Sequence, residues 1–240
     1  MTRANSWHED ILCGFDTETT GTDPETARIV TASILIRGGD HEDAWSWLVN
    51  PGVDIPAEAA AVHGITTERA QAEGMDAATA VTEIACRLAD AMLGHPLVIY
   101  NAPYDLTVLD RETRRYGITP FGDVLEGCAA TIVDPLVLDK HLDRYRRGKR
   151  TLTAACEHYG VTFDGAHESD ADALAAMRVA WKIARAYPAI AGMSRVELHD
   201  LQVKAKADQA ASFQDYLRKQ GNDEVVDGSW PYRPYTGGES

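Results

Sequence analysis

Two acids, Asp16 and Glu18, stand two residues apart at the end of a short apolar stretch. Residues two apart in an extended chain point to the same face, so these carboxylates are expected side by side. Like charges held together are costly unless cations compensate them, and hard divalent ions are the natural compensation. A bare Asp-x-Glu is more often a pair of solvated acids at the end of a strand. Here the turn residues Thr19, Thr20 and Gly21 follow directly and would bring backbone N–H groups and hydroxyls close to whatever the acids hold.

Two later segments carry groups of the same kind. Pro103 favours the first turn of a helix, so Asp105 is expected in that turn. An acid in the first turn is stabilised by the helix dipole alone. His167 precedes Asp172 by five residues, and positions five apart do not share a helical face. We therefore expect His167 on a mobile loop before a helix and Asp172 in its first turns, facing inward. Asp170 is the main rival of Asp172 as a ligand, and an isolated histidine in a polar loop is more often simply exposed.

The elements that must position these groups follow from periodicity and turn residues. Strands are expected at residues 11–16, 29–36, 44–49, 97–100 and 131–133. Helices are expected at residues 76–92, 103–116, 136–144, 152–159, 170–187 and 195–219. Strands in a meander that later alternate with helices predict an α/β fold. Its sheet would be mixed and five-stranded, with three antiparallel strands followed by parallel ones, and flanked by helices.

The chain divides into a domain at residues 1–190 and a C-terminal helix with an irregular tail at residues 191–240. Ser194 followed by Glu197 indicates a capping box at the start of that helix. The tail that follows the helix is rich in glycine and proline, and we expect it to be irregular or disordered.

The composition excludes several classes of protein. No run of about twenty apolar residues is present, so we expect no membrane span. The N-terminus lacks the apolar region of a secretory signal. The cysteines are widely spaced without a Cys-x-x-Cys pair, which argues against a zinc site and a disulfide framework and favours a cytoplasmic location with reduced thiols.

The net charge of −14 bears on what the protein can bind. Proteins that grip nucleic acid usually present a basic surface, so this chain should bind duplex weakly. It would act on short or single-stranded ends, or be held by a partner. One basic cluster stands against this background, and it consists of Arg144, Arg146, Arg147, Lys149 and Arg150, with Tyr145 among them. It would contact backbone phosphates, or else it is an exposed loop that aids solubility.

Together the three motifs resemble those of the DEDDh group of DnaQ-like exonucleases, which includes the proofreading subunit of bacterial replicative polymerases. The first motif, Asp-x-Glu-Thr-Thr-Gly at residues 16–21, is matched in full. The second is matched by Asn101, Tyr104 and Asp105, and the third by His167 and Asp172. A His-Gly-Ile-Thr segment at residues 63–66 also fits. The resemblance covers about residues 10–185. The family often has His where this chain has Tyr100, and Phe where it has Tyr104, and nothing in its pattern requires residues 195–240.

The resemblance implies a ribonuclease H-like fold and a metal-dependent 3′→5′ exonuclease that releases nucleoside 5′-monophosphates. It implies two divalent metal ions, Mg²⁺ or Mn²⁺, held by Asp16, Glu18, Asp105 and Asp172, with His167 as general base. The residues implied to bind the substrate are Thr17, Thr19, Thr20, His63, Asn101 and Tyr104.

Two questions about function stay open at the level of the sequence. The expected partner is a single-stranded 3′ end, with DNA favoured over RNA and a proofreading or repair role, but RNA-trimming exoribonucleases share these motifs. The alternative from another class is a non-catalytic interaction module that docks on a polymerase or repair complex through the helix at residues 195–219.

Overall fold

A mixed sheet with the strand order β4-β3-β2-β1-β5-β6 organises the chain in the computed structural model, which describes residues 6–128, 130–163 and 165–237. The strands are β1 (Leu12–Thr19), β2 (Ile29–Gly38), β3 (His41–Asn50), β4 (Met75–Asp76), β5 (Leu97–Val98) and β6 (Ile132–Val133). The first three pair antiparallel, and β5 and β6 continue parallel to β1. This confirms the predicted α/β fold and adds β4, a two-residue strand parallel to the end of β3.

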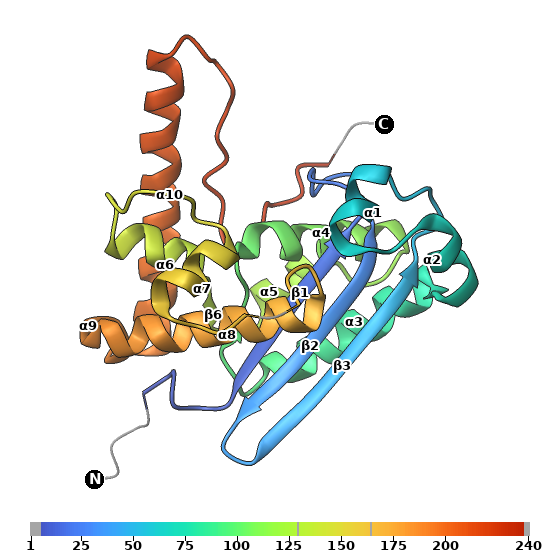
Figure 1. Ribbon diagram of the computed structural model, residues 1–240, viewed down its shortest axis with the longest axis horizontal. Coiled ribbons are helices and arrows are strands. Elements are labelled where there is room, and N and C mark those ends of the chain that lie inside the picture. The colour runs from blue at the N-terminus through green and yellow to red at the C-terminus, as the bar shows by residue number, and fades with distance from the viewer. Residues whose placement is uncertain (1–5, 129, 164, 238–240) are drawn as a thin grey trace.

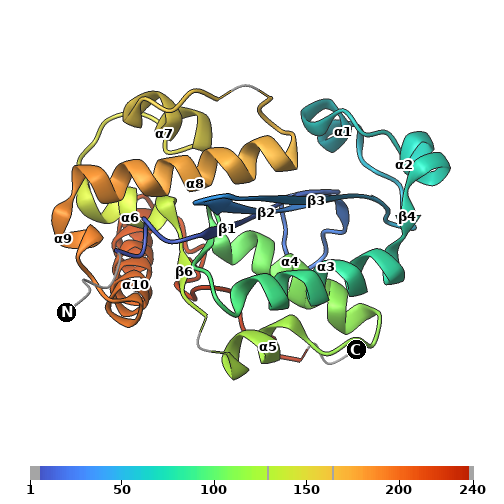
Figure 2. The same cartoon turned by 90° about the horizontal axis from the view of Figure 1, so that it is seen from below.

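The helices form layers on the two faces of the sheet (Figures 1 and 2). Their bounds are α1 (Ala57–His63), α2 (Thr67–Glu73), α3 (Ala77–Met92), α4 (Ala102–Arg115), α5 (Phe121–Gly127), α6 (Pro135–Leu142), α7 (Leu152–Tyr159), α8 (Ser169–Ala186), α9 (Pro188–Ala191) and α10 (Arg195–Lys219). Figure 2 shows α8, with α7 outside it, on one face, and α3, α4 and α5 on the other.

The close approach of α8 to the sheet depends on Gly14 in β1. A Cβ atom there would lie 2.5 Å from Sδ of Met177 and 3.2 Å from the carbonyl oxygen of Ala173, so a larger residue would push α8 away. Because side chains alternate along a strand, the even-numbered residues of β1 face α8. Asp16 and Glu18 share that parity, so β1 directs both carboxylates towards α8.

The C-terminal helix α10 is attached to the far edge of the sheet. The predicted capping box is present, because the Ser194 backbone N–H bonds the Glu197 carboxylate and the Glu197 N–H bonds the Ser194 hydroxyl. Buried Gln202 accepts a bond from the Asp134 N–H (2.7 Å) and donates to the Ile132 carbonyl (2.9 Å). These bonds satisfy backbone groups at the outer edge of β6, the last strand in the sheet order, and fix α10 against that edge.

After α10 the chain returns along the molecule as an irregular segment, residues 222–237, which we call the C-terminal strap (Figure 1). It has no helix or strand, as predicted. It nevertheless packs on the fold, with the Trp230 side chain only 8% exposed. Residues 238–240 of the predicted tail lie outside the described residues. Among the described residues, no helix combines the length and apolar character that a bilayer crossing needs.

Candidate active site

Acids from three elements converge beside the end of β1. Asp16 and Glu18 face α8, whose first turn carries Asp172. Asp105 comes from the first turn of α4, on the other side of the sheet. It accepts hydrogen bonds from the backbone N–H of Thr17 (3.0 Å) and from the Thr17 hydroxyl (2.7 Å). The structure therefore brings together four carboxylates that lie far apart in the sequence.

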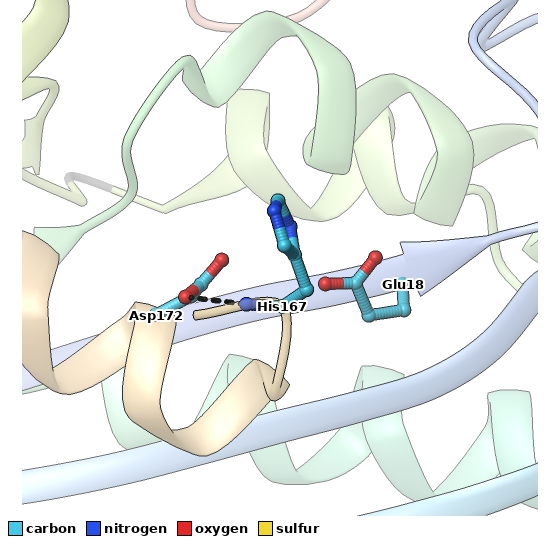
Figure 3. Close-up of side chains that lie close together, drawn as sticks. All are labelled: Glu18, His167 and Asp172. Atoms are coloured by element: carbon cyan, nitrogen blue, oxygen red, sulfur yellow. Dashed lines mark hydrogen bonds between the residues drawn. The ribbon is translucent and has the colours of Figure 1, made fainter. Parts of the chain in front are cut away.

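His167 lies at the same place, immediately before α8 (Figure 3). One ligand atom from each of Glu18, His167 and Asp172 lies within 4.8 Å of the others. The His167 backbone is left-handed, with φ of 71°, and its N–H donates to the Asp172 carboxylate (3.2 Å). Asp170 is exposed and bonds only the neighbouring Ala171 N–H among the described contacts. Asp172, and not its rival Asp170, is therefore the acid in this group.

The acid cluster is electrostatically unfavourable without cations. Burial, followed by repulsion from Asp172 and Asp105, raises the pKa of Glu18 to about 8. Burial raises the pKa of Asp105 to about 7, although the hydrogen bonds from Thr17 oppose this. Burial and the neighbouring carboxylates also raise the pKa of Asp16 well above its ordinary value. Such a cluster of oxygen donors suits hard divalent cations, which remove the repulsion on binding.

Comparison with known proteins identifies the family of the chain. The model of the exonuclease family RNase T matches residues 13–180, a span that contains all four acids and His167. The chain belongs to the DnaQ-like exonuclease family. An uncharacterized exonuclease of Escherichia phage 186 is 32% identical over 175 residues, which cover 71% of this chain and 86% of that protein.

Other relatives are longer than this exonuclease. The DNA polymerase III subunit epsilon of Rickettsia prowazekii is 29% identical over 67% of this chain and 66% of that protein. The structure of E. coli exonuclease I with a dT13 oligonucleotide superposes with a TM-score of 0.62 at 18% identity, over 75% of this chain and 43% of that one. At that identity the likeness shows the fold, which exonuclease I shares.

The threonines of the first motif are engaged within the exonuclease fold itself. The Thr17 hydroxyl is bonded to Asp105. The Thr19 hydroxyl donates to the Gly21 carbonyl (2.9 Å) and also contacts the Tyr104 hydroxyl. The Thr20 hydroxyl accepts from the Arg28 N–H (3.0 Å). Their side chains therefore hold the turn in place, and their predicted contact with the substrate stays a prediction.

The second motif is set up by a residue that the sequence did not single out for this role. Asn101 is exposed and left-handed, with φ of 69°. Buried Asp134 accepts the N–H groups of Asn101 and Ala102, each at 3.0 Å, and also caps α6 through the Leu136 N–H. The Asp-Pro pair at residues 134–135 is a helix-start signal that would have indicated the cap, but not its reach to Asn101.

A second unpredicted contact fixes the start of α8. The Ser169 hydroxyl lies 2.8 Å from the hydroxyl of Ser33 on β2, which in turn lies 2.9 Å from that of Ser46 on β3. These three linked hydroxyls connect the turn that carries His167 to the sheet. No local sequence signal marks these serines, because each pairs with residues distant in the chain.

His63 is the last residue of α1 and lies near the site. Its Nδ1 accepts the Ile65 N–H (3.2 Å), and its Nε2 is buried without a partner among the described residues. Burial lowers the pKa of His63, and the nearby charge of His167 adds to this while the Thr19 carbonyl opposes it. His63 thus borders both Thr19 and His167, which is compatible with its predicted role near the terminal nucleotides.

The predicted basic cluster is corrected by the structure, because two of its five cations are not available to phosphates. Arg146 and Arg150 each bond the buried carboxylate of Asp139 at 2.6 Å. Burial alone would raise the pKa of Asp139, but the bonds from these two arginines and from Tyr159 outweigh it and hold the pKa below its ordinary value. These arginines therefore organise the loop.

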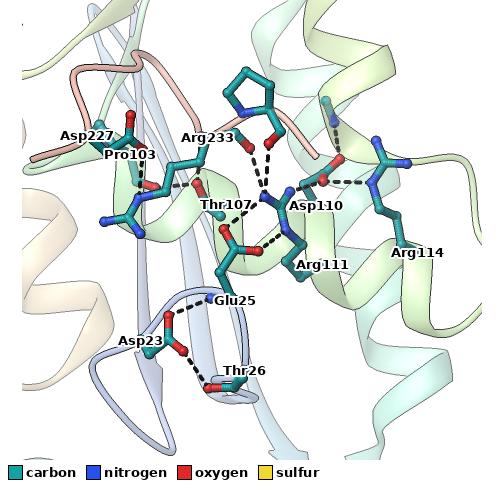
Figure 4. A network of polar contacts seen from close by, with 12 residues as sticks. Asp23, Glu25, Thr26, Pro103, Thr107, Asp110, Arg111, Arg114, Asp227 and Arg233 are labelled. Carbon is teal, nitrogen blue, oxygen red and sulfur yellow. Dashed lines mark hydrogen bonds and ion pairs between the residues drawn. The ribbon is translucent and has the colours of Figure 1, made fainter. Parts of the chain in front are cut away.

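The C-terminal strap is joined to α4, the helix that carries Asp105 (Figure 4). Arg111 is 5% exposed and bonds both oxygens of Glu25, at 2.6 and 3.0 Å, in the loop between β1 and β2. It also pairs with Asp110 and donates to the carbonyl of Arg233 in the strap (3.0 Å). One guanidinium thus links α4, the strap and the loop that follows the first motif.

We predict that Arg111→Ala destabilises the fold strongly. Among the described contacts, the change leaves buried Asp110 with Arg114 and the Gly122 N–H, and it releases Glu25. Removing one partner of a buried ion pair costs about 3–5 kcal/mol, and the remaining partners favour the lower end. Urea unfolding measures it. Arg69→Ala, which removes an exposed pair, is the control and should cost less than about 1 kcal/mol. Equal losses for both variants would contradict the assignment.

We also predict that the metal-free protein loses stability as pH rises. An acid whose pKa is raised on folding, such as Glu18, keeps its proton in the folded state after the unfolded chain has lost it. The stability that this acid contributes is therefore full below about pH 4 and is lost as pH rises towards 8. Melting temperatures in EDTA between pH 5 and 8 measure this. Glu18→Gln should flatten the fall, and a rise in stability over this range in the parent protein would contradict the prediction.

Proposed function

We propose that this exonuclease removes nucleotides one at a time from the 3′ end of single-stranded nucleic acid, with DNA favoured over RNA, and releases nucleoside 5′-monophosphates. The observation that carries the proposal is the convergence of Asp16, Glu18, Asp105 and Asp172 with His167 beside the end of β1. A silent interaction module would have no need to keep so costly a cluster.

The four carboxylates would hold two divalent metal ions, Mg²⁺ or Mn²⁺. Such a pair neutralises the phosphodiester and makes a bound water more acidic. The chain's own contribution is to fix the oxygens and to place a base. His167 is held before α8 by the bond from its backbone N–H to Asp172, and would accept a proton from the attacking water as a general base.

The terminal nucleotide would lie against His63, Asn101 and Tyr104, with the backbone of residues 17–20 receiving the 3′-hydroxyl. Support comes from the placement of these groups around the acids, and from relatives that are named as exonucleases or as a polymerase subunit. A polymerase or repair complex in the cytoplasm is the partner we propose on the same basis.

A degradation assay tests the proposal. Purified protein with Mg²⁺ or Mn²⁺ should shorten a 5′-labelled strand stepwise, and should release labelled mononucleotide first from a 3′-labelled one. Parallel reactions with single-stranded DNA, duplex DNA, mismatched duplex and RNA define the substrate. Release of the 5′ label first would overturn the polarity, and faster loss of RNA would overturn the preference for DNA.

A further inference from the structure

The loop between α6 and α7, residues 143–151, is held rigid from inside, and we call it the basic loop. Asp139 is fully buried and accepts bonds from Arg146, Arg150 and Tyr159, the last at 2.9 Å. Arg150 also donates to the carbonyls of Asp139 (3.0 Å) and Asp143. Two arginines are thus used to fix the loop's shape, so its other side chains are presented in a defined arrangement.

Those other side chains face solvent. Arg144, Arg147 and Lys149 are exposed, and Tyr145 is 86% exposed. The Arg144 guanidinium lies 5.8 Å from the centre of the Tyr145 ring. Exposed aromatic rings among cations are the combination by which proteins hold single strands, since bases stack on the ring while the cations contact phosphates. In a chain of net charge −14, such a cluster is suited to a polyanion.

The basic loop borders the site described above. The Tyr100 hydroxyl donates to the Arg150 carbonyl (2.8 Å), and Tyr100 directly precedes Asn101 of the second motif. Asp134, which holds the Asn101 N–H, begins α6, and the basic loop begins after the last residue of that helix. A helix of this length spans about 12 Å, so the loop lies within a few nucleotides of a strand end bound at Asn101.

Helix α10 continues the same surface outward. Arg144 donates to the Ser212 hydroxyl (3.1 Å), which places the basic loop against α10. Beside Ser212, the rings of Phe213 and Tyr216 stack with centroids 6.2 Å apart and are 52% and 57% exposed. Figure 1 shows this end of α10 projecting beyond the other helices. Arg218 and Lys219 follow, whereas Asp208 and Asp215 are the acids on this part of the helix.

We propose that the basic loop and the outer end of α10 form a second binding surface for single-stranded nucleic acid, upstream of the 3′ end; this rests on the proposed function. Arg144, Arg147 and Lys149 contact phosphates, and Tyr145 stacks on a base. Phe213 and Tyr216 extend the stacking surface. The basic loop lies inside the matched span of residues 13–180 and α10 lies beyond it, so α10 extends the binding surface from outside the family domain.

Binding of a fluorescent 20-nucleotide oligothymidylate by the full chain in EDTA tests this, because no hydrolysis interferes. The triple variant Arg144→Ala, Arg147→Ala, Lys149→Ala should lower the slope of log affinity against log salt by about 2, since each phosphate contact to a single strand contributes about 0.7. Tyr145→Ala should weaken binding about tenfold and leave the salt slope unchanged, because stacking is not electrostatic.

The matched control is Arg178→Ala, Lys182→Ala, Arg185→Ala, which removes three cations from the outer face of α8. An equal loss of slope in this control, or an unchanged slope in the basic-loop variant, overturns the proposal. The proposal is also overturned if the basic-loop variant loses binding to an acidic peptide but keeps its binding to the oligonucleotide.

Hydrolysis of the p-nitrophenyl ester of thymidine 5′-monophosphate, too small to reach the basic loop, separates the two proposals. The basic-loop variant should cleave it at the parental rate. If the parent protein binds the strand with the expected slope but cleaves neither the ester nor the strand, the proposed function fails and the binding surface stands.

Discussion

Asp16→Asn should leave no measurable shortening of a 5′-labelled oligonucleotide in Mg²⁺ or Mn²⁺. Asp16 shares its site with the other three acids, and a neutral amide there would weaken the hold on both proposed cations. Removing a general base typically lowers the rate by about 10²–10⁴-fold. The loss of a metal ligand should be at least as severe, so we expect a decrease of at least about 10²-fold. Gel analysis of the oligonucleotide over time measures it.

The control for this variant is Asp170→Asn, which changes an exposed acid at the start of the same helix that carries Asp172. It should keep parental activity. The Asp16 variant should also melt at a higher temperature than the parent in EDTA at pH 8, since it removes one of the crowded carboxylates. That rise separates lost chemistry from misfolding. The same ladder from parent and Asp16→Asn would show that the activity belongs to a contaminant.

His167→Ala should lower kcat by about 10²–10⁴-fold while KM changes little. The reason is that the His167 side chain is exposed and is placed beside Glu18 and Asp172. The dependence of kcat on pH should also become weaker in the variant, because the group that accepts the proton of the attacking water is gone. Rates measured on single-stranded DNA between pH 5.5 and 9 test both expectations.

His141→Ala, which changes an exposed histidine on α6, is the matched control and should leave the pH profile intact. A metal titration decides between base and ligand. If His167 is a base, the Mn²⁺ concentration that gives half-maximal activity stays within about threefold of the parent's, whereas loss of a ligand would raise it by at least about tenfold. A variant with parental kcat would exclude both roles.

Features that depend on neighbours in the sequence could be predicted. The alternation of β1 placed Asp16 and Glu18 on one face, and the Ser194–Glu197 capping box fixed the start of α10. The strands β1, β2 and β3 and the longer helices were predicted for the same reason, because their apolar residues repeat with the period of the element. The short strands β5 and β6 were predicted as brief apolar runs. The family motifs then supplied the set of acids and the histidine.

Features that depend on partners distant in the chain could not be predicted from the sequence. The run of cations did not reveal that Arg146 and Arg150 form ion pairs with Asp139. Nothing in such a run distinguishes the side chains that folding buries from those that stay exposed. The tie between Ser33 and Ser169 spans 136 residues. The helices α1, α2, α5 and α9 and the strand β4 are too short for a period to show.

The contacts of the C-terminal strap bear on the order in which the molecule can be assembled. Arg233 bonds Thr107 across 126 residues of sequence, so this contact can form only after Arg233 has been synthesised. Contacts of such long range carry a high entropic cost and form late in folding. The side of α4 that bears Arg111 therefore stays uncovered on the ribosome until the strap emerges, and a chain interrupted before Trp230 would expose it permanently.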